Sequence, residues 1–314
     1  MPYRHPDGCA VGHRQVERDM QIDLKFDYLD RVRKIAALYT KRKTSDLLDG
    51  DFHSLQHGRS LDFDDLREYR FGDDVNMIDW KSSSRAGKTL IRRYFAERRH
   101  NVLFVGDTGL KMTGDTPAGE SKEQIALMAF GIAAYLFGKQ GVNYALSCCD
   151  RDGNRITPFL SGPGHLEELL YSYKNAIENG EPSQSFGETL FKTASSFVRH
   201  MVMILITDAE GLAQLDEGLI RRLIYYNDVY IFCIEDASLT DENAYDLEAG
   251  AFADPFLAIC EDLRRQEQQI REQMEQSAER ALTPNRIFFK KISRESEIID
   301  ALIWLFGRRR GTIL

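Results

Sequence analysis

Two aspartates, each at the end of a short apolar run, are the residues best placed to do chemistry in this sequence. Asp107 ends the run over residues 101–107, and Asp208 directly follows the run over residues 201–207. The carboxyl ends of neighbouring parallel strands meet at one edge of a sheet, where doubly wound α/β proteins bind their ligands. Carboxylate oxygens suit a hard cation such as Mg²⁺. The pattern therefore predicts a carboxylate site at the edge of a sheet.

The elements that must position these aspartates alternate between short apolar strands and helices. Strands are expected at residues 89–97, 101–107, 144–148, 156–160, 201–207, 229–234 and 286–290. Helices are expected at residues 24–38, 121–139, 165–179, 190–198, 215–226, 255–282 and 295–306. Alternation of this kind is typical of a parallel sheet that is covered by helices on both faces. The predicted fold class is α/β, with a doubly wound, mostly parallel sheet.

Composition divides the chain into three parts. Residues 1–19 show neither helical nor strand periodicity and contain two prolines and two glycines, so we expect a disordered tail, with Met20 as an alternative start. Residues 20–98 combine the first helix with a loop-rich segment, which is expected to pack on the core. Residues 99–314 are expected to form the α/β domain.

The charge balance limits the classes of partner. A formal charge of -8 at pH 7 argues against a general affinity for nucleic acid or anionic lipid. The local exception is the basic patch Arg85, Lys88, Arg92, Arg93, Arg98 and Arg99. We expect this patch to be a solvated, charge-paired surface, which disfavours nucleic acid as a partner.

The expected location of the protein is the cytoplasm. The five cysteines do not have the spacing of a zinc site and fit a reducing compartment. The first residues lack the apolar region of a signal peptide, and no segment approaches the roughly 20 apolar residues of a membrane span.

Signatures of catalytic chemistry are missing from the sequence. Neither Gly-x-Ser-x-Gly nor a Cys–His pairing in a signature context is present. Residues 106–109, Gly-Asp-Thr-Gly, lack the Gly-Lys-Ser/Thr ending of a phosphate-binding loop, so ATP chemistry would belong to a partner.

An ordered series of residues ahead of the α/β domain resembles the signature of the DUF58 family, which reads approximately REY-x-x-GDD-x-x-x-IDW-x-x-S-A-R. The matching residues are Arg67, Glu68, Tyr69, Gly72, Asp73, Asp74, Asp79, Trp80 and Arg85. In that family the signature lies just ahead of a von Willebrand factor A-like domain, and the resemblance covers residues 24–306. It implies an accessory protein whose gene frequently lies beside that of a MoxR-type AAA+ ATPase, which is the partner we expect.

The resemblance to A-type domains also implies a metal-ion-dependent adhesion site, built from Asp-x-Ser-x-Ser, a Thr and a second Asp. Here Asp107, Thr189 and Asp208 fill the Asp, Thr and second Asp positions, whereas Gly109 and Lys111 replace the two serines. Because a fixed positive charge repels a divalent cation, we expect the Lys111 ammonium to pair with Asp107 and Asp208 instead. No metal or cofactor is expected; Mg²⁺, if bound, would use Asp107, Thr189 and Asp208.

The site residues also have a purely structural interpretation. Asp107 and Asp208 are suited to cap the segments that follow them, and Thr189 is suited to cap a helix over residues 190–198. For Thr189 the two interpretations are equally supported.

A structural role is also favoured for the DUF58 signature. We expect a tight turn at Gly72, Asp73 and Asp74. We also expect charge-assisted hydrogen bonds to Asp79 from Arg67 or Arg85, and burial of Trp80.

The long helix expected over residues 255–282 carries a narrow apolar stripe. Its members are Ile259, Leu263, Ile270, Met274 and Ala278. The helix either lies along the sheet, which we favour, or exposes part of the stripe as a docking surface.

The expected function is that of a non-enzymatic accessory or adaptor protein, which binds a partner protein at the edge of the A-type domain. Two alternatives stay open. One is a divalent-metal-dependent hydrolase that acts at the Asp107/Asp208 edge. The other is nucleic-acid binding through the basic patch of residues 85–99.

Overall fold

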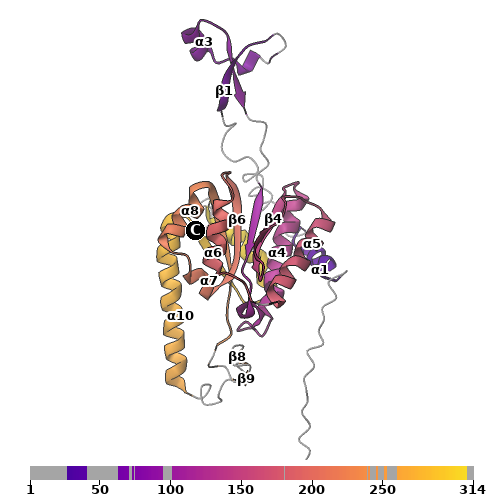
Figure 1. Cartoon of the computed structure of the whole chain (residues 1–314), viewed down its shortest axis with the longest axis vertical. Helices are drawn as coiled ribbons and strands as arrows, with labels where there is room; N and C mark the ends of the chain where they lie inside the picture. The colour runs from indigo at the N-terminus through magenta and orange to yellow at the C-terminus, as the bar shows by residue number, and fades with distance from the viewer. Residues whose placement is uncertain are drawn as a thin grey trace, which may run out of the picture.

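A six-stranded, mostly parallel sheet forms the centre of the protein (Figure 1). The computed structural model describes residues 27–40, 63–70, 73, 75–94, 101–179, 181–238, 240, 245–246, 251–252 and 260–309. The strands are β3 (Val102–Gly106), β4 (Tyr144–Asp150), β5 (Gly153–Ile156), β6 (Met201–Asp208), β7 (Asn227–Ile234) and β10 (Phe288–Ile292). Their spatial order is β10-β7-β6-β3-β4-β5, and β5 alone in this sheet pairs antiparallel with its neighbour.

The strand order makes the sheet doubly wound, as predicted. The chain runs from β3 outward to β4 and β5, then returns to the other side of β3 and continues through β6, β7 and β10. The direction of winding therefore reverses between β3 and β6. At such a point the loops after two adjacent parallel strands diverge and leave room for a ligand.

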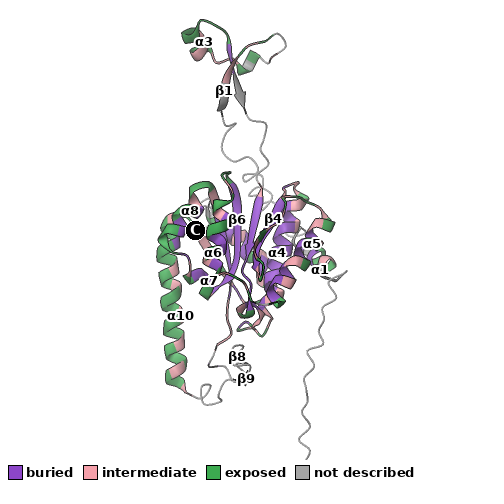
Figure 2. Ribbon diagram, in the orientation of Figure 1, coloured by how far each residue is buried: buried purple, intermediate pink, exposed green. Residues whose placement is uncertain are grey.

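Helices cover both faces of the sheet. One face packs on α4 (Lys122–Lys139), α5 (Pro163–Glu178) and α11 (Ile298–Arg309), and the other on α6 (Phe186–Ser195) and α8 (Glu217–Tyr226). Alternate side chains of β3 point to opposite faces, so Phe104 belongs to the first core and Leu103 to the second. Burial on both faces explains why the strands read as continuous apolar runs, and Figure 2 shows them as the most buried part of the molecule.

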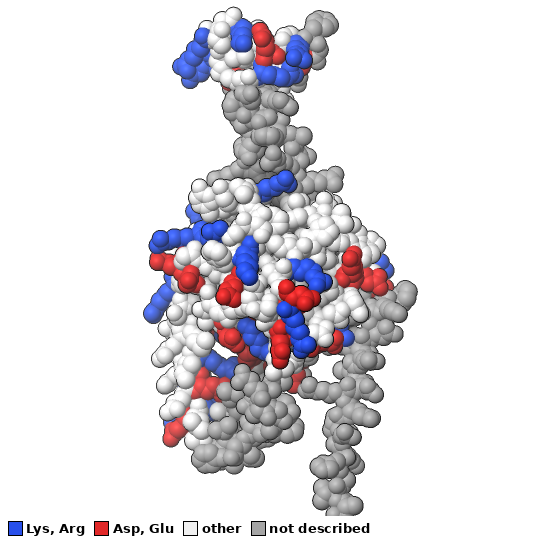
Figure 3. Space-filling view, viewed as in Figure 1, with Lys and Arg blue, Asp and Glu red and all other residues white. Residues whose placement is uncertain are grey.

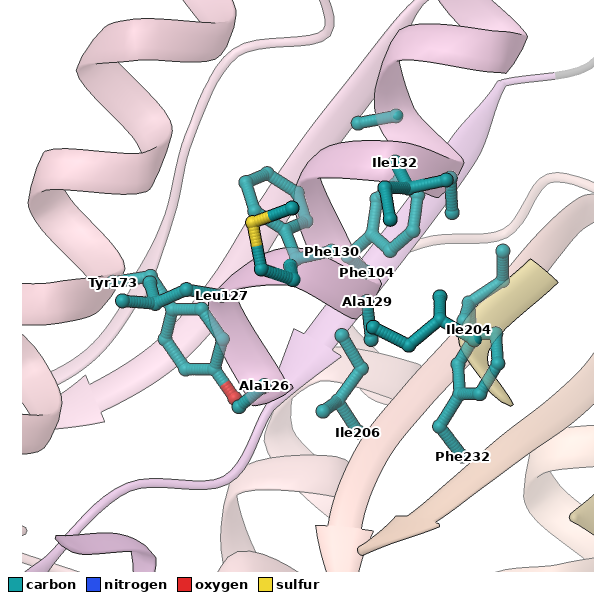
Figure 4. Packing of buried hydrophobic residues seen from close by; sticks show 14 of the residues in the cluster. Phe104, Ala126, Leu127, Ala129, Phe130, Ile132, Tyr173, Ile204, Ile206 and Phe232 are labelled. Carbon is teal, nitrogen blue, oxygen red and sulfur yellow. The ribbon is translucent and has the colours of Figure 1, made fainter. Parts of the chain in front are cut away.

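The first core is built around α4, which is apolar on all sides. Phe130 of α4 contacts the ring of Phe104 edge to face, with centroids 4.9 Å apart, and the ring of Tyr173 at 6.2 Å (Figure 4). Helix α1 (Asp27–Thr40) packs on the outer side of α4 through Val32, which is fully buried. Gly131 permits this approach, because a Cβ at that position would lie 2.9 Å from Val32 Cγ2.

Several predicted boundaries shift for local physical reasons. Helix α6 starts at residue 186 rather than 190, because Ser185 and Glu188 form a capping box. The helix expected over residues 215–226 is α8, which starts at residue 217 after its cap, Asp216. A further short helix that was not expected, α7 (Ala209–Ala213), precedes it and is capped by Asp208. The edge strand lies at residues 153–156 rather than 156–160; within the expected range, Ile156 pairs with Ser147 and Leu160 forms an isolated bridge to Tyr144.

The DUF58 signature forms a small unit outside the main sheet. Strands β1 (Phe63–Glu68) and β2 (Leu90–Tyr94) pair antiparallel, and η1 (Val75–Met77) and α3 (Trp80–Ala86) lie between them in sequence. The strand expected over residues 89–97 is therefore β2. Figure 1 shows this unit on the side of the sheet where β3 begins. The division into domains, with residues 20–98 packed on the core, stays a prediction beyond the contact of α1 with α4.

Two further expectations concern the ends of the chain and membrane attachment. The tail over residues 1–19 lies outside the described residues. Across the part of the chain that the structure describes, no helix has both the length and the apolar composition that crossing a bilayer requires.

Candidate functional site

Asp107 and Asp208 lie side by side at the carboxyl edge of the sheet, where the winding reverses. Asp107 follows β3, Asp208 is the last residue of the adjacent strand β6, and Lys111 reaches both of them from η2 (Leu110–Thr113). Lys111 Nζ lies 2.9 Å from Asp107 Oδ2 and 3.3 Å from Asp208 Oδ1. A third carboxylate, that of the exposed Glu210, lies 3.9 Å from the same nitrogen. The ammonium group thus occupies the position between the two aspartates.

A second lysine, Lys122, completes the cluster and was not identified from the sequence. It is the first residue of α4, and its side chain is only 1% exposed. Lys122 Nζ lies 2.9 Å from Asp208 Oδ2 and also donates to Asp236 Oδ1, just beyond β7. We call Asp107, Lys111, Lys122, Asp208 and Asp236 the lysine–carboxylate cluster. It ties the carboxyl ends of three neighbouring strands to α4 and η2.

The backbone of Asp107 and its carboxylate are both held in place. Thr207 Oγ1 donates to Asp107 Oδ2 over 2.5 Å, and the Thr108 amide donates to Oδ1 over 2.9 Å. The buried Tyr173 hydroxyl donates to the Asp107 carbonyl oxygen over 3.1 Å. Gly211 lets α7 approach this point, because a Cβ there would lie 2.5 Å from Asp107 Oδ2.

Asp208 has both of the roles considered for it. Its Oδ1 accepts a hydrogen bond of 3.0 Å from the Gly211 amide and so caps α7, while the same carboxylate receives both lysines. The capping interpretation and the site interpretation are therefore compatible.

Burial and charge set the protonation states of the cluster. Burial raises the pKa of Asp107 to about 6, although the charge of Lys111 opposes the shift. Burial alone would also raise the pKa of Asp208, but the ammonium groups of Lys122 and Lys111 outweigh it and hold that pKa below its ordinary value. Burial lowers the pKa values of both lysines, yet their carboxylate partners leave both pKa values raised. Both lysines are therefore charged at neutral pH.

The raised pKa of Asp107 predicts a particular pH dependence of stability. Between its ordinary value of 3.8 and the folded value of about 6, the folded protein binds more protons at this carboxyl than the unfolded chain does. Ionisation of Asp107 therefore destabilises the fold as pH rises through this window. We expect the free energy of unfolding of the wild type to fall relative to that of Asp107→Asn from pH 4 to 6, measured by urea denaturation. A difference that does not change with pH would contradict this assignment.

Thr189 is not hydrogen-bonded to Asp107 or Asp208 in the described part of the structure. Its hydroxyl donates to the Ser185 carbonyl oxygen within α6, over 3.0 Å, and within the described ranges it forms no hydrogen bond to Asp107, Lys111 or Asp208. The capping interpretation is wrong too, because Ser185 caps α6 and Thr189 lies inside the helix.

The residues present do not fit a divalent cation. Lys111 Nζ stands between the two carboxylates, and Lys122 adds a second positive charge to Asp208. Gly109 has φ 99° and ψ 175°, a backbone conformation that an L-residue such as serine adopts only with strain. Among the described residues, no group of three or more His, Cys, Asp or Glu side chains is arranged to hold a metal ion.

The DUF58 signature is held by a bidentate ion pair. Arg67 Nη1 and Nη2 lie 2.9 Å and 2.6 Å from the two carboxylate oxygens of Asp73, which also accepts from the Arg70 amide over 2.7 Å. These hydrogen bonds lower the pKa of Asp73. The turn predicted at Asp73 thus has a defined anchor, while Gly72 and Asp74 lie outside the described residues.

Asp79 and Trp80 lie at the start of α3. Asp79 caps the helix by accepting from the Ser82 amide over 3.0 Å, and Arg67 pairs with Asp73 rather than with Asp79. Trp80 is 71% exposed rather than buried, because it is the first residue of a helix that has no buried residue.

Among the described residues of the signature and the basic patch, Glu68, Arg85 and Lys88 are exposed and Tyr69 is half-buried. Tyr69 joins β1 to β2 through its amide, which donates to the Thr89 carbonyl oxygen, and Glu68 Oε2 lies 3.7 Å from Lys88 Nζ. Arg85 is exposed in the last turn of α3, where positive charge is favourable. Figure 3 shows acidic and basic side chains interspersed over the face in view. Arg98 and Arg99 of the basic patch lie outside the described residues, and so do the side chains of Arg92 and Arg93.

The strand order and the cluster at the reversal point define a doubly wound α/β protein with a lysine-filled carboxylate site. The model of the family described as "Protein of unknown function DUF58" matches residues 65–281, and the chain belongs to this family. No curated protein matches the chain.

Solved structures that resemble the chain include three proteins of low sequence identity. A von Willebrand factor type A protein from Catenulispora acidiphila is 14% identical, with a TM-score of 0.38 over 68% of this chain and 43% of that one. An aerotolerance-related membrane protein from Bacteroides fragilis is 14% identical, with a TM-score of 0.42 over 67% of this chain and 99% of that one. The pilus adhesin SpaC from Lactobacillus rhamnosus GG is 10% identical, with a TM-score of 0.39 over 68% of this chain and 30% of that one. The chain thus spans less than half of the first and third of these proteins.

Proposed function

We propose that the chain is a non-enzymatic accessory protein of the cytoplasm that binds a protein partner at the carboxyl edge of its sheet, without a metal ion. The partner we propose is a MoxR-type AAA+ ATPase. The observation that carries the proposal is the lysine–carboxylate cluster. The Lys111 ammonium group stands between Asp107 and Asp208, where a cation would have to bind, and Lys122 also pairs with Asp208. The charges that would hold a metal are thus neutralised by the chain itself.

The same cluster presents charge at the surface. Lys111 keeps 23% of its side chain exposed while it pairs with two carboxylates, and Glu210 beside it is 68% exposed. A fixed, partly exposed ion pair of this kind favours oriented contact with a complementary protein surface. The alternative function, a metal-dependent hydrolase, needs a divalent cation at this position. The positive charges of Lys111 and Lys122 repel such a cation and therefore disfavour this alternative. The class of partner rests on the resemblance to the DUF58 family.

A direct binding experiment tests the proposal. Purified full-length chain is immobilised and exposed to a purified MoxR-type ATPase loaded with a non-hydrolysable ATP analogue. We expect binding to the wild type and a loss of at least about tenfold in affinity for Lys111→Glu, which reverses the charge between Asp107 and Asp208. Arg265→Glu is the control, because Arg265 is exposed on α10 (Glu261–Leu282), away from the cluster.

Metal independence is measured separately by titrating Mg²⁺ and Mn²⁺ into the chain alone. We expect no saturable heat and no change in melting temperature. Failure of the ATPase to bind would refute the partner, and saturable Mg²⁺ binding that disappears in Asp208→Asn would refute the metal-free site.

A further inference from the structure

A groove of about 790 Å³ runs between α10 and the ends of α7 and β7. Its apolar lining includes Leu212 and Ala213 of α7, Phe289 of β10, and Ile270, Met274 and Ala278 of α10. Pockets that hold ligands commonly have volumes of about 300–1,000 Å³, so the groove is large enough for several side chains of a partner.

Helix α10 leaves part of its apolar stripe uncovered. Ile270 is 57% exposed and Met274 is 41% exposed, whereas Leu282 at the end of the helix is buried. Figure 2 shows α10 exposed along most of its length. The helix therefore packs on the core at its carboxyl end and holds the middle of its stripe open over the groove. Ile259, the first member of the predicted stripe, lies outside the described residues.

The groove is continuous with the candidate site. Glu210 and Asp236 line it, and both contact lysines of the cluster: Glu210 lies 3.9 Å from Lys111 Nζ, and Asp236 pairs with Lys122. A partner that contacts the cluster would therefore meet the apolar groove directly beside it.

The charged lining of the groove is predominantly acidic. Five carboxylates line it, those of Glu210, Glu235, Asp236, Glu267 and Glu275, against the two cations of Arg271 and Lys291. Arg271 pairs with Glu267, Lys291 with Glu275, and Lys122 with Asp236. The charges in excess are those of Glu210 and Glu235, whose nearest cations lie 3.9 Å and 3.8 Å away. Glu210, at 68%, is the most exposed of these carboxylates and is available to a partner.

The segment that directly precedes α10 is itself acidic and does not complement the charge of the groove. Residues 241–259, which precede α10, contain Asp241, Glu242, Asp246, Glu248 and Asp254 and no lysine or arginine. A second copy of the chain would bring a net charge of -8. Like charges on both sides disfavour either occupant, so charge complementarity favours a basic partner.

We infer that this groove binds a basic amphipathic segment of a partner protein. Apolar side chains of that segment contact Ile270 and Met274, and a lysine or arginine reaches Glu210. An amphipathic helix laid into an apolar groove is a recurring mode of protein recognition. The inference deepens the proposed function and rests on it for the existence of a protein partner.

Two synthetic peptides test the inference on the full-length chain. Each has about 14 residues and the same leucine stripe at helical spacing, with lysine on the polar face of one and glutamate on the polar face of the other. Binding is followed by the anisotropy of a fluorescein label. We expect the lysine peptide to bind at least tenfold more tightly than the glutamate peptide, and its affinity to fall with added salt.

Three variants locate the binding. Met274→Asp is expected to weaken the lysine peptide at least tenfold despite the added negative charge, and Glu210→Gln to weaken it several-fold. Gln276→Asp is the matched control, since residue 276 is exposed on the same helix and does not line the groove. It adds the same charge and should not reduce affinity. If Met274→Asp lowers the melting temperature, Ile270→Gln replaces it.

The outcomes separate the inference from the proposed function. Equal binding of both peptides, or full affinity in Met274→Asp and Ile270→Gln, would overturn the groove as a binding site. Lysine-peptide binding that needs Met274, together with no binding of the ATPase, would support the groove and refute that partner. ATPase binding that Met274→Asp leaves unchanged would support the function and refute the groove.

Discussion

Replacement of Lys122 by methionine is expected to lower the free energy of unfolding by about 3–5 kcal/mol, the usual cost of removing one partner from a buried ion pair. Lys122 is 1% exposed and contacts both Asp208 and Asp236. Without the ammonium group of Lys122, Lys111 is the one cation within 4 Å of the buried Asp208 among the described residues. Methionine preserves most of the side-chain volume, so loss of charge pairing rather than loss of packing dominates the change.

Urea denaturation followed by circular dichroism measures this effect. Lys139→Met is the control, because Lys139 is exposed in the last turn of the same helix. It is expected to cost less than about 1 kcal/mol. Equal urea midpoints for Lys122→Met and the wild type would show that Lys122 does not support the cluster.

Replacement of Gly106 by alanine is the second change for which we expect a large effect. A Cβ at this position, the last of β3, would lie 2.4 Å from Tyr173 Cε2 and 2.5 Å from Tyr173 Cζ. Tyr173 is fully buried, its ring contacts Phe130, and its hydroxyl donates to the Asp107 carbonyl oxygen. The ring therefore cannot move without disturbing the core and the backbone of the site. We expect a loss of about 3 kcal/mol or more in the free energy of unfolding.

A control glycine and a compensating substitution test whether the loss of stability comes from the contact between residue 106 and Tyr173. Gly164→Ala lies in α5, where no described atom comes within 4 Å of the added Cβ, and it is expected to be neutral or to stabilise by up to about 1 kcal/mol. Tyr173→Leu in the Gly106→Ala background should recover part of the loss, because the two changes share one contact. Additive losses in the double variant would contradict the steric explanation.

Most of the fold follows from local sequence patterns. β3, β6 and β7 lie within about two residues of their predicted limits, because strands buried on both faces are continuous apolar runs. Errors occur where a short polar signal decides the outcome. The capping box at Ser185 and Glu188 was present in the sequence and would have placed the start of α6 correctly. The expected burial of Trp80 is wrong because it rests on the general tendency of large aromatic residues to be buried. Its exposure follows from its place at the start of α3, a helix without buried residues.

The candidate site was predictable where it depends on strand ends. Asp107 and Asp208 follow from that rule, and Asp236 follows β7 in the same way, although it was overlooked. Lys122 left a weaker signal: a lysine in the first turn of a helix opposes the helix dipole, which requires a compensating anion. The anion is Asp208, which lies 86 residues away in the sequence. This partner cannot be read from local patterns, because it depends on where the start of α4 lies relative to the end of β6 in the folded protein.

The cluster also has an evolutionary consequence. Two serines at positions 109 and 111 would not by themselves restore a cation site. A serine at 109 would have to adopt the conformation with φ 99° that Gly109 has, and Lys122 Nζ would still lie 2.9 Å from Asp208 Oδ2. Loss of Lys122 first would pass through an intermediate with an under-compensated buried carboxylate. Substitutions at 111 and 122 therefore act on the same carboxylate, so the effect of one depends on the other, and this dependence constrains the order in which they can accumulate.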